Sequence, residues 1–278
     1  TDKLKENSLY EFFTSIEMPL VPVLTEMEYN GVYVDPNLLR SMSQEIGKKL
    51  DILTSSIYKI SDKEFNINST QQLAIILFDD LELPQIKKRS TAEDVLKKLK
   101  DHHELPKLIL EYRKYNKLKN TYLDSLSDLI ENSTGRIHTT FNQTIASTGR
   151  LSSTKPNFQN IPIRTLEGRE IRKAFIAKNI GWKILSADYS QVELRVMAHF
   201  SQDKSLIDAF KNSEDVHSRT ASKVFNVPIN MVLPEMRRTA KIVNFGIMYG
   251  AGAFRMSQEL GISRAEAAAI IENYFKQY

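Results

Sequence analysis

An apolar pattern over residues 36–60 predicts one long amphipathic helix, and it constrains the fold more than any other feature of the sequence. Leucine, isoleucine and methionine recur there at steps of three and four residues, which places them on one helical face. Asp35 supplies an N-cap, Pro36 suits the first helical position, and Gly31 suits the turn before them. Further helical patterns follow over residues 69–81, 91–100 and 105–132. The first half of the chain is therefore expected to be a helical arm.

The composition is that of a folded, water-soluble protein. The 278 residues allow two or three subdomains, and 41% hydrophobic and 26% charged residues match an ordinary globular chain. No apolar run reaches the roughly 20 residues of a bilayer span, and residues 1–5 lack the apolar core of a signal peptide, so we expect a cytoplasmic protein without membrane contact. The absence of cysteine excludes thiolate metal sites. Any metal must be held by carboxylates or histidine, and magnesium fits best.

Positive charge is concentrated in two zones of the chain. Residues 1–84 carry 7 basic and 14 acidic side chains, whereas residues 85–120 carry 11 and 5, and residues 136–178 carry 8 and 2. Basic zones are often only solvated faces, so the charge alone leaves nucleic-acid binding open.

The second half mixes strands with helices. Residues 136–144 alternate and are β-branched, which predicts a strand. Residues 183–188 predict a second strand, followed by a helix over 191–200. The remainder, from residue 203 to 278, predicts helices separated by proline and glycine.

Asp188, at the end of the second expected strand, is the sharpest candidate for chemistry. A carboxylate at that position can hold a divalent cation. Phosphoryl transfer uses such cations to neutralise charge on phosphate oxygens and to align the attacking and leaving oxygens. A two-metal site needs at least one further acid, and Asp188 taken without its context is more readily explained as a cap of the following helix.

Arg237, Lys241, Phe245 and Tyr249 are spaced by four and follow a potential helix start at Pro234. On a helix the four span an arc of about 120° and a length of about 18 Å, so they form one stripe. Two cations at one end suit a triphosphate, and two aromatic rings at the other can stack on a sugar and base. The pattern also fits a solvated cationic end that grades into buried aromatic residues.

Ordered motifs along the chain resemble those of family A of the DNA polymerases. The segment 188–195 is similar to motif A and 237–250 to motif B. The resemblance covers nearly the whole chain, because further segments match in order. These are residues 18–35 (start of the thumb), 65–69 (its tip region), 148–153, 156–162 and 215–218.

The resemblance implies an α+β chain with the right-hand polymerase architecture. Residues 1–18 would be a connector from an N-terminal, exonuclease-like region, and residues 19–133 a helical thumb. Residues 134–202 would form part of an antiparallel-sheet palm. Residues 203–278 would form helical fingers, truncated at the C-terminal side.

The resemblance also assigns roles around the incoming nucleotide. Asp188 would bind both Mg²⁺ ions of the intact enzyme, and the backbone carbonyl of Tyr189 would complete one coordination shell. Glu193 would act as a steric gate against ribonucleotides. The implied catalytic residues are Asp188, His217, Arg237 and Lys241, and the implied nucleotide contacts are Gln191, Glu193, His217, Arg237, Lys241, Phe245 and Tyr249.

A second implied set contacts primer and template. Contacts from the thumb would position the duplex without reading its sequence. The basic link 87–89 is shorter than the family's thumb tip. The implied DNA contacts are Ser90, Thr91, Arg113, Lys117, Arg150, Gln159, Asn160, Arg164 and Tyr249.

The family's motif C, a His-Asp-Glu on a hairpin, does not occur in this sequence. The chain begins without methionine and ends inside a helical pattern. We therefore expect a fragment, cut at both ends, that is inactive by itself.

The expected function is DNA-directed DNA polymerisation in replication or repair. The partners would be primer–template DNA and deoxynucleoside triphosphates, and the protein would be a monomer associated with the nucleoid. Two alternatives stay open. Glu193 and Phe245 argue against a single-subunit RNA polymerase, and only the absent motif C supports a non-catalytic primer–template binding module.

Overall fold

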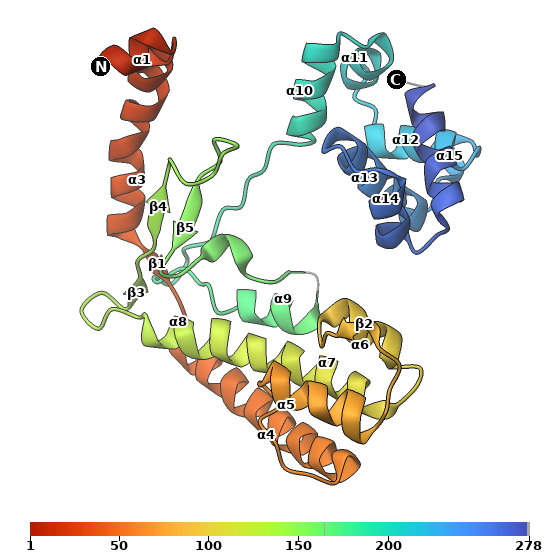
Figure 1. Cartoon of the computed structure of the whole chain (residues 1–278). Coiled ribbons are helices and arrows are strands. Elements are labelled where there is room, and N and C mark those ends of the chain that lie inside the picture. The colour runs from red at the N-terminus through yellow and green to blue at the C-terminus, as the bar shows by residue number, and fades with distance from the viewer. Residues whose placement is uncertain (164, 277–278) are drawn as a thin grey trace. The chain divides into compact units, whose positions relative to one another are not determined.

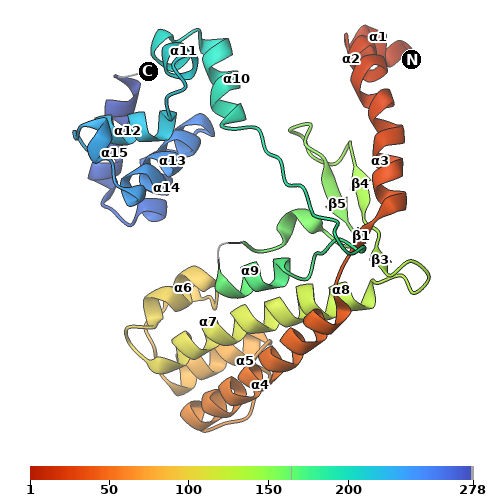
Figure 2. The same ribbon diagram turned by 180° about the vertical axis from the view of Figure 1, so that it is seen from behind.

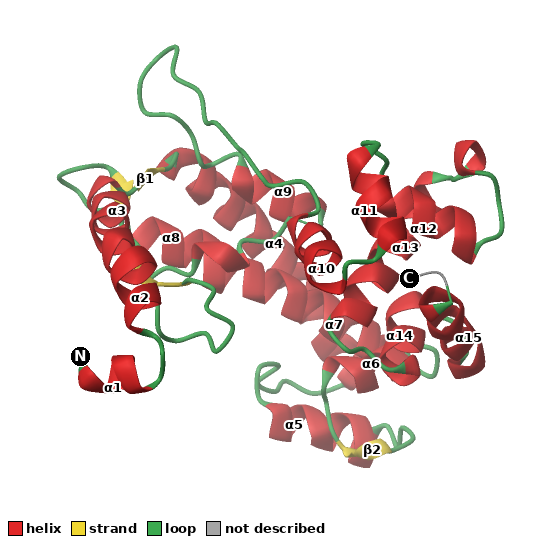
Figure 3. Ribbon diagram, turned by 90° about the horizontal axis from the view of Figure 1, so that it is seen from above, coloured by secondary structure: helices red, strands yellow, loops and turns green. Residues whose placement is uncertain are grey.

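A computed structural model describes residues 1–163 and 165–276, and the chain divides into two compact units, Thr1–Leu185 and Ser186–Tyr278. Helices dominate both units (Figures 1 and 3). The strands of the described part are short and pair in antiparallel two-stranded sheets. The expected α+β class is confirmed. The division into connector, thumb, palm and fingers stays a prediction, and the boundary between the units lies inside the segment 134–202.

The first unit contains short strands among helices and helical turns. In chain order its elements are α1 (Asp2–Glu6), α2 (Tyr10–Phe12), the π-helical turn η1 (Phe13–Glu17), α3 (Met18–Asn30), β1 (Val32–Tyr33), α4 (Pro36–Ser61), α5 (Thr70–Ile75), the π-helical turn η2 (Ile76–Asp80), β2 (Ile86–Arg89), α6 (Glu93–Leu99), α7 (Glu104–Lys117), the π-helical turn η3 (Leu118–Asp124), α8 (Ser125–Asp128), β3 (Arg136–Ile137), β4 (Thr140–Asn142), β5 (Ser152–Thr154), the 3-10 turn η4 (Phe158–Asn160) and α9 (Leu166–Arg172).

The expected long helix is confirmed as α4, with 26 residues and therefore a length of about 39 Å. The Asp35 side chain accepts hydrogen bonds from the backbone N–H groups of Asn37 and Leu38, at 2.9 and 3.1 Å. Gly31 ends α3 with φ +58°, a backbone conformation that favours glycine. The other expected helices are also confirmed, with ends that differ by a few residues. They are α5 with η2, α6, and α7 with η3 and α8.

The buried face of α4 contributes to two hydrophobic cores. Ile57, near its C-terminal end, packs with α5, η2, α6 and α7. Leu39 and Ile46, in its N-terminal half, pack with η3, α8, β3 and α9. Helix α7 runs along α4 (Figure 2), so this helix pair supports both cores.

The strand expected over residues 136–144 is confirmed in two pieces. β3 pairs with β1, with Val32 opposite Ile137, and β4 pairs with β5, with Phe141 opposite Ser153. The interruption coincides with Thr139, which is buried and shares a hydrogen bond of 2.7 Å with Ser153. The chain therefore changes its strand partner at this point.

The prediction of a strand over residues 183–188 is wrong. The segment is exposed, has no regular secondary structure, and precedes α10 as an extended link (Figure 1). A strand forms only where a neighbouring strand pairs with its backbone N–H and C=O groups. The described residues provide no such neighbour for this segment, so it does not form a strand.

The second unit is helical. Its elements are α10 (Val192–Ser201), α11 (Lys204–Lys211), α12 (Val216–Val224), the 3-10 turn η5 (Ile229–Met231), α13 (Pro234–Met248), α14 (Ala253–Leu260) and α15 (Arg264–Phe275). One core joins α10, α11 and the start of α12, and Met248 at the end of α13 packs against it. A second core joins α13, α14 and α15. Helix α13 therefore contributes to both cores. No helix of the described residues is both long and apolar enough to cross a membrane.

The cap of α4 gives the first testable prediction. Asp35→Ala removes the acceptor of two N–H groups, so we expect the free energy of unfolding to fall by about 1 kcal/mol. Urea unfolding followed by circular dichroism measures the change. The matched control is Asp51→Ala in the same helix, where an exposed carboxylate makes no side-chain hydrogen bond within the described chain. An equal loss in both variants would contradict the capping role.

Candidate functional site

Asp215 and Arg237 join the starts of α12 and α13. One Asp215 carboxylate oxygen accepts the backbone N–H of Ser218 at 2.9 Å and caps α12. The other accepts Nε and Nη2 of Arg237, at 3.0 and 2.5 Å. The Arg237 guanidinium is thereby held by one edge, and Nη1 has no partner among the described residues.

The pKa of the Asp215 carboxyl is the balance of opposing effects. Burial raises the pKa. The hydrogen bonds and the charge of Arg237, together with the hydrogen bond from the Ser218 N–H, lower it by a larger amount, so the net shift is downward. The carboxylate form is therefore favoured in the folded chain.

Two buried polar residues surround His217 one turn further along the helix pair. The Thr220 hydroxyl donates to Oδ1 of Asn244 at 3.1 Å, and Nδ2 of Asn244 lies 2.9 Å from Nδ1 of His217. The His217 ring centroid lies 5.7 Å from that of Phe245. Burial lowers the pKa of His217, the charges of Arg237 and Lys241 lower it too, and Asp215 opposes them. The imidazole is therefore neutral near pH 7.

Three of the four residues of the expected stripe lie on α13. Arg237, Lys241 and Phe245 lie on the helix, and the Lys241 ammonium lies 5.9 Å from the centre of the Phe245 ring. Tyr249 follows the last helical residue as its C-cap and is 58% exposed. The structure thus places His217, Arg237 and Phe245 together. Their nucleotide contacts stay predictions.

Asp188 and Tyr189 lie in the exposed link before α10, and Tyr189 is 82% exposed. Gln191 is the N-cap of α10 with φ +55°, and its Oε1 is buried without a hydrogen-bond partner. Glu193 is half-buried in the first turn of α10. No hydrogen bond or ion pair within the described chain joins Asp188 to Arg237. That the two motifs share one site stays a prediction.

The described residues contain no group of three or more His, Cys, Asp or Glu side chains that could hold a metal. Asp188 and the Tyr189 carbonyl are oxygen donors of the kind that Mg²⁺ prefers. One carboxylate and one carbonyl do not complete a two-metal site. The residues present therefore do not fit the expected pair of ions on their own.

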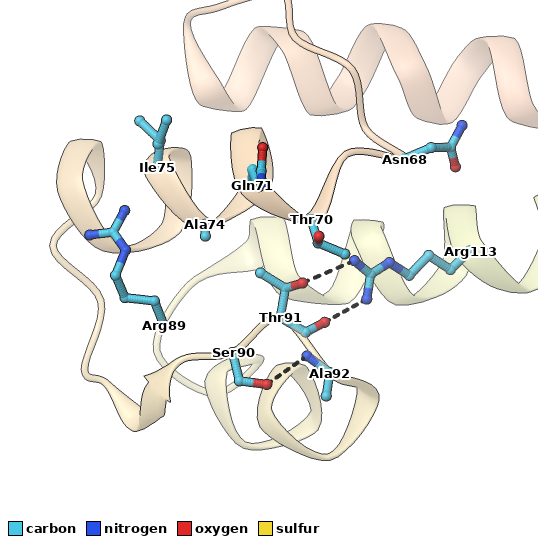
Figure 4. Close-up of a pocket in the computed structure, with 10 residues that line it drawn as sticks. All are labelled: Asn68, Thr70, Gln71, Ala74, Ile75, Arg89, Ser90, Thr91, Ala92 and Arg113. Carbon is cyan, nitrogen blue, oxygen red and sulfur yellow. Dashed lines mark hydrogen bonds between the residues drawn. The ribbon is translucent and has the colours of Figure 1, made fainter.

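The first unit has a pocket of about 830 Å³ between α5, the end of β2 and α7 (Figure 4). Arg113 points across it and donates to the backbone oxygen of Thr91 at 2.5 Å and to its hydroxyl at 3.3 Å. Thr91 is buried, and the Ser90 hydroxyl accepts the Ala92 N–H at 3.3 Å. Burial lowers the pKa of the Arg113 guanidinium, which nevertheless stays charged. Arg113 and Thr91 therefore hold the start of α6 to α7.

The other expected DNA contacts are distributed over the same unit. Lys117 lines pockets beside η3. Gln159 Nε2 donates to the Leu151 carbonyl at 2.8 Å, and the Asn160 carbonyl accepts the Tyr122 hydroxyl at 2.7 Å. Arg150 is exposed, and Arg164 lies outside the described residues. All of these contacts stay predictions.

Sequence reasoning assigned no role to Thr220, Asn244 or Arg89. A signal existed for Asn244, because an asparagine between apolar residues on a helix needs a buried partner. No sequence signal identified that partner, since Thr220 is 24 positions away. Arg89 pairs with Asp79 through both guanidinium ends beside the first-unit pocket.

The ion pair between Asp215 and Arg237 predicts how the stability of the chain depends on pH. Because the folded pKa lies below the ordinary value of about 3.9, the carboxylate stabilises the second unit above that pH and loses this effect as pH falls through its folded pKa. We expect Asp215→Asn to lower Tm near pH 6 and the deficit to shrink towards pH 3. Differential scanning calorimetry measures both. Asp208→Asn, at an exposed position of α11, is the control, and a deficit that is independent of pH would contradict the charge effect.

Comparison with protein-family models matches residues 36–278 to DNA polymerase family A. The chain is 51% identical over 277 residues to DNA polymerase I of Pseudomonas aeruginosa, covering 98% of this chain and 30% of the relative. It is 48% identical over 279 residues to the thermostable DNA polymerase I of Thermus aquaticus, covering 98% and 33%. The chain thus spans about a third of the length of these curated relatives.

Among solved structures, the chain is similar to the POL domain of Pol1 from M. smegmatis in complex with DNA primer-template and dNTP. The TM-score is 0.89 at 41% identity, and the match covers 100% of this chain and 50% of that chain. The expected right-hand architecture is confirmed by this likeness. The chain belongs to DNA polymerase family A.

Proposed function

We propose that this chain is the part of a DNA-directed DNA polymerase that grips the incoming deoxynucleoside triphosphate and holds primer–template DNA. The observation that carries the proposal is the meeting of Arg237, His217 and Phe245 on the facing sides of α12 and α13. The similar solved complex contains DNA primer-template and dNTP, which supports this assignment. The reaction would join the primer 3′-hydroxyl to the α-phosphate and release pyrophosphate.

The second unit would supply the electrostatic part of the reaction. Arg237 is fixed through Nε and Nη2, so Nη1 can point a pre-organised donor at a phosphate oxygen. Lys241, one turn further along α13, adds a second positive charge. These groups would stabilise negative charge as it develops on the leaving pyrophosphate. Phe245 would pack beside the sugar and Tyr249 near the templating base, with Gln191 and Glu193 on the opposite side of the nucleotide.

Magnesium would neutralise phosphate charge when bound. We propose that Asp188 and the Tyr189 carbonyl are two of its oxygen ligands in the whole enzyme. The remaining acid would come from the part of the relatives that this chain does not match. The described residues contain no group of three or more metal-binding side chains, and we propose that this chain by itself does not polymerise.

The first unit would hold the duplex through its backbone. Ser90, Thr91, Arg113 and Lys117 would act at the thumb, and Arg150, Gln159, Asn160 and Arg164 nearer the primer terminus. We propose a monomer that works on DNA in the cytoplasm during replication or repair.

A chimera tests the catalytic assignment. This chain replaces the matching segment of the Pseudomonas aeruginosa relative, and we expect the chimera to extend a primer with deoxynucleotides. Asp188→Asn in the chimera should lower kcat by about 10³-fold or more, because the charge that binds the cation is lost. Single-turnover primer extension measures both, with Asp208→Asn as the control. A chimera that binds primer–template tightly but never extends it would favour a non-catalytic binding module instead.

The same chimera tests the steric gate. Glu193→Ala should reduce the preference for deoxynucleotides over ribonucleotides by about 10- to 200-fold, since a shape-based contact is removed. The ratio of kcat/KM values for the two substrates measures the preference. Asp208→Ala serves as the control, and unchanged discrimination in Glu193→Ala would withdraw the gate assignment.

A further inference from the structure

We propose that Asn244, held by Thr220, is a positioning residue that fixes the tautomer of His217, so that Nε2 carries the proton and acts as a hydrogen-bond donor. The assignment of the nucleotide as the acceptor of that proton rests on the proposed function. The tautomer itself follows from the contacts between α12 and α13.

The orientation of the Asn244 amide gives the direction of each hydrogen bond. The Thr220 hydroxyl donates to Oδ1 of Asn244 at 3.1 Å, which places the amide oxygen on the Thr220 side. The amide Nδ2 then faces Nδ1 of His217 at 2.9 Å. An amide nitrogen only donates, so Nδ1 must be the acceptor. A neutral imidazole that accepts at Nδ1 carries its proton on Nε2.

The surroundings couple the amide to the ring. Asn244 is 0% exposed and Thr220 1%, so water does not replace a lost partner of the amide. If the Asn244 amide turned over, its nitrogen would face the Thr220 hydroxyl and its oxygen would face Nδ1, which would require the other tautomer. Buried polar groups in folded proteins keep their partners, so the amide and the ring are set together.

The charged groups that face His217 do not favour its protonation. Arg237 and Lys241 come from α13 and Asp215 precedes α12. Burial and the two cations lower the pKa of the ring against the opposing effect of Asp215. Nε2 has no hydrogen-bond partner among the described residues. At neutral pH the ring therefore offers one donor, without a change of charge, beside the Arg237 guanidinium.

Nitrogen NMR on the 278-residue chain tests the tautomer directly. The chain is labelled with ¹⁵N-histidine, and His217→Gln identifies the His217 signals among those of the five histidines. We expect a two-bond ¹H–¹⁵N spectrum in which Nδ1 is unprotonated and Nε2 protonated. A wild-type spectrum showing protonated Nδ1 and unprotonated Nε2 overturns the proposal without any further variant.

Two substitutions test the cause of the tautomer. Asn244→Asp places a carboxylate oxygen opposite Nδ1, so Nδ1 should become protonated and the pKa of His217 should rise. Thr220→Val removes the donor that orients the amide, so both tautomers should be populated. Ser257→Ala, which removes a buried hydroxyl bonded within its own helix, is the control. If Asn244→Asp does not fold, the Thr220→Val spectrum decides. An unchanged pattern in both variants overturns the proposal.

Kinetics in the chimera separate this inference from the proposed function. Asn244→Asp should raise KM for the deoxynucleotide by about tenfold, with a smaller change in kcat. The same substitution in a His217→Gln background should add no further increase. If NMR shows the expected tautomer but KM does not move, the tautomer assignment stands and the proposed contact of His217 with the nucleotide fails. If the added effect persists without His217, Asn244 acts only on folding, and its positioning role is overturned.

Discussion

The Asp215 carboxylate is the interaction on which the arrangement of the second unit's polar residues depends. One oxygen starts α12 and the other holds Arg237 near the start of α13. His217 lies in the first turn of the helix that Asp215 caps, so the position of its ring follows from the same carboxylate. A single acid thus places a cation and a neutral donor side by side. The Thr220–Asn244 pair then sets which nitrogen of the ring donates.

The first unit depends on α4 in a different way. Its apolar stripe is long enough to enter two cores, and α7 runs along it in both. Arg113 on α7 reaches the start of α6 through Thr91. Residues expected to contact DNA therefore also hold the unit together. Substitutions at Arg113 or Thr91 will change stability as well as any DNA affinity, and the two effects must be measured separately.

Asp188 shows why a motif is not yet a site. Its segment was expected to be a strand, but the described residues provide no strand beside it, and it is exposed and without regular secondary structure. The chain spans about a third of its curated relatives. A two-metal site needs at least two acids brought to one place, and this requires contacts between distant segments.

The sequence by itself determined the local elements and the family. Periodicity and capping residues predicted α4 and α13, because helical bonds join residues four apart and their signals are local. The motifs around Asp188 and Arg237 indicated family A, because each consists of particular residue types at fixed short spacings. Only the tertiary structure decided the pairing of Asp215 with Arg237, the break at Thr139 and the loss of the strand before Asp188. These depend on partners far away in the chain, which periodicity does not identify. For Asn244, the sequence pattern of its helix indicates that the side chain is buried. Its partner Thr220 is identified only by the packing of α12 against α13.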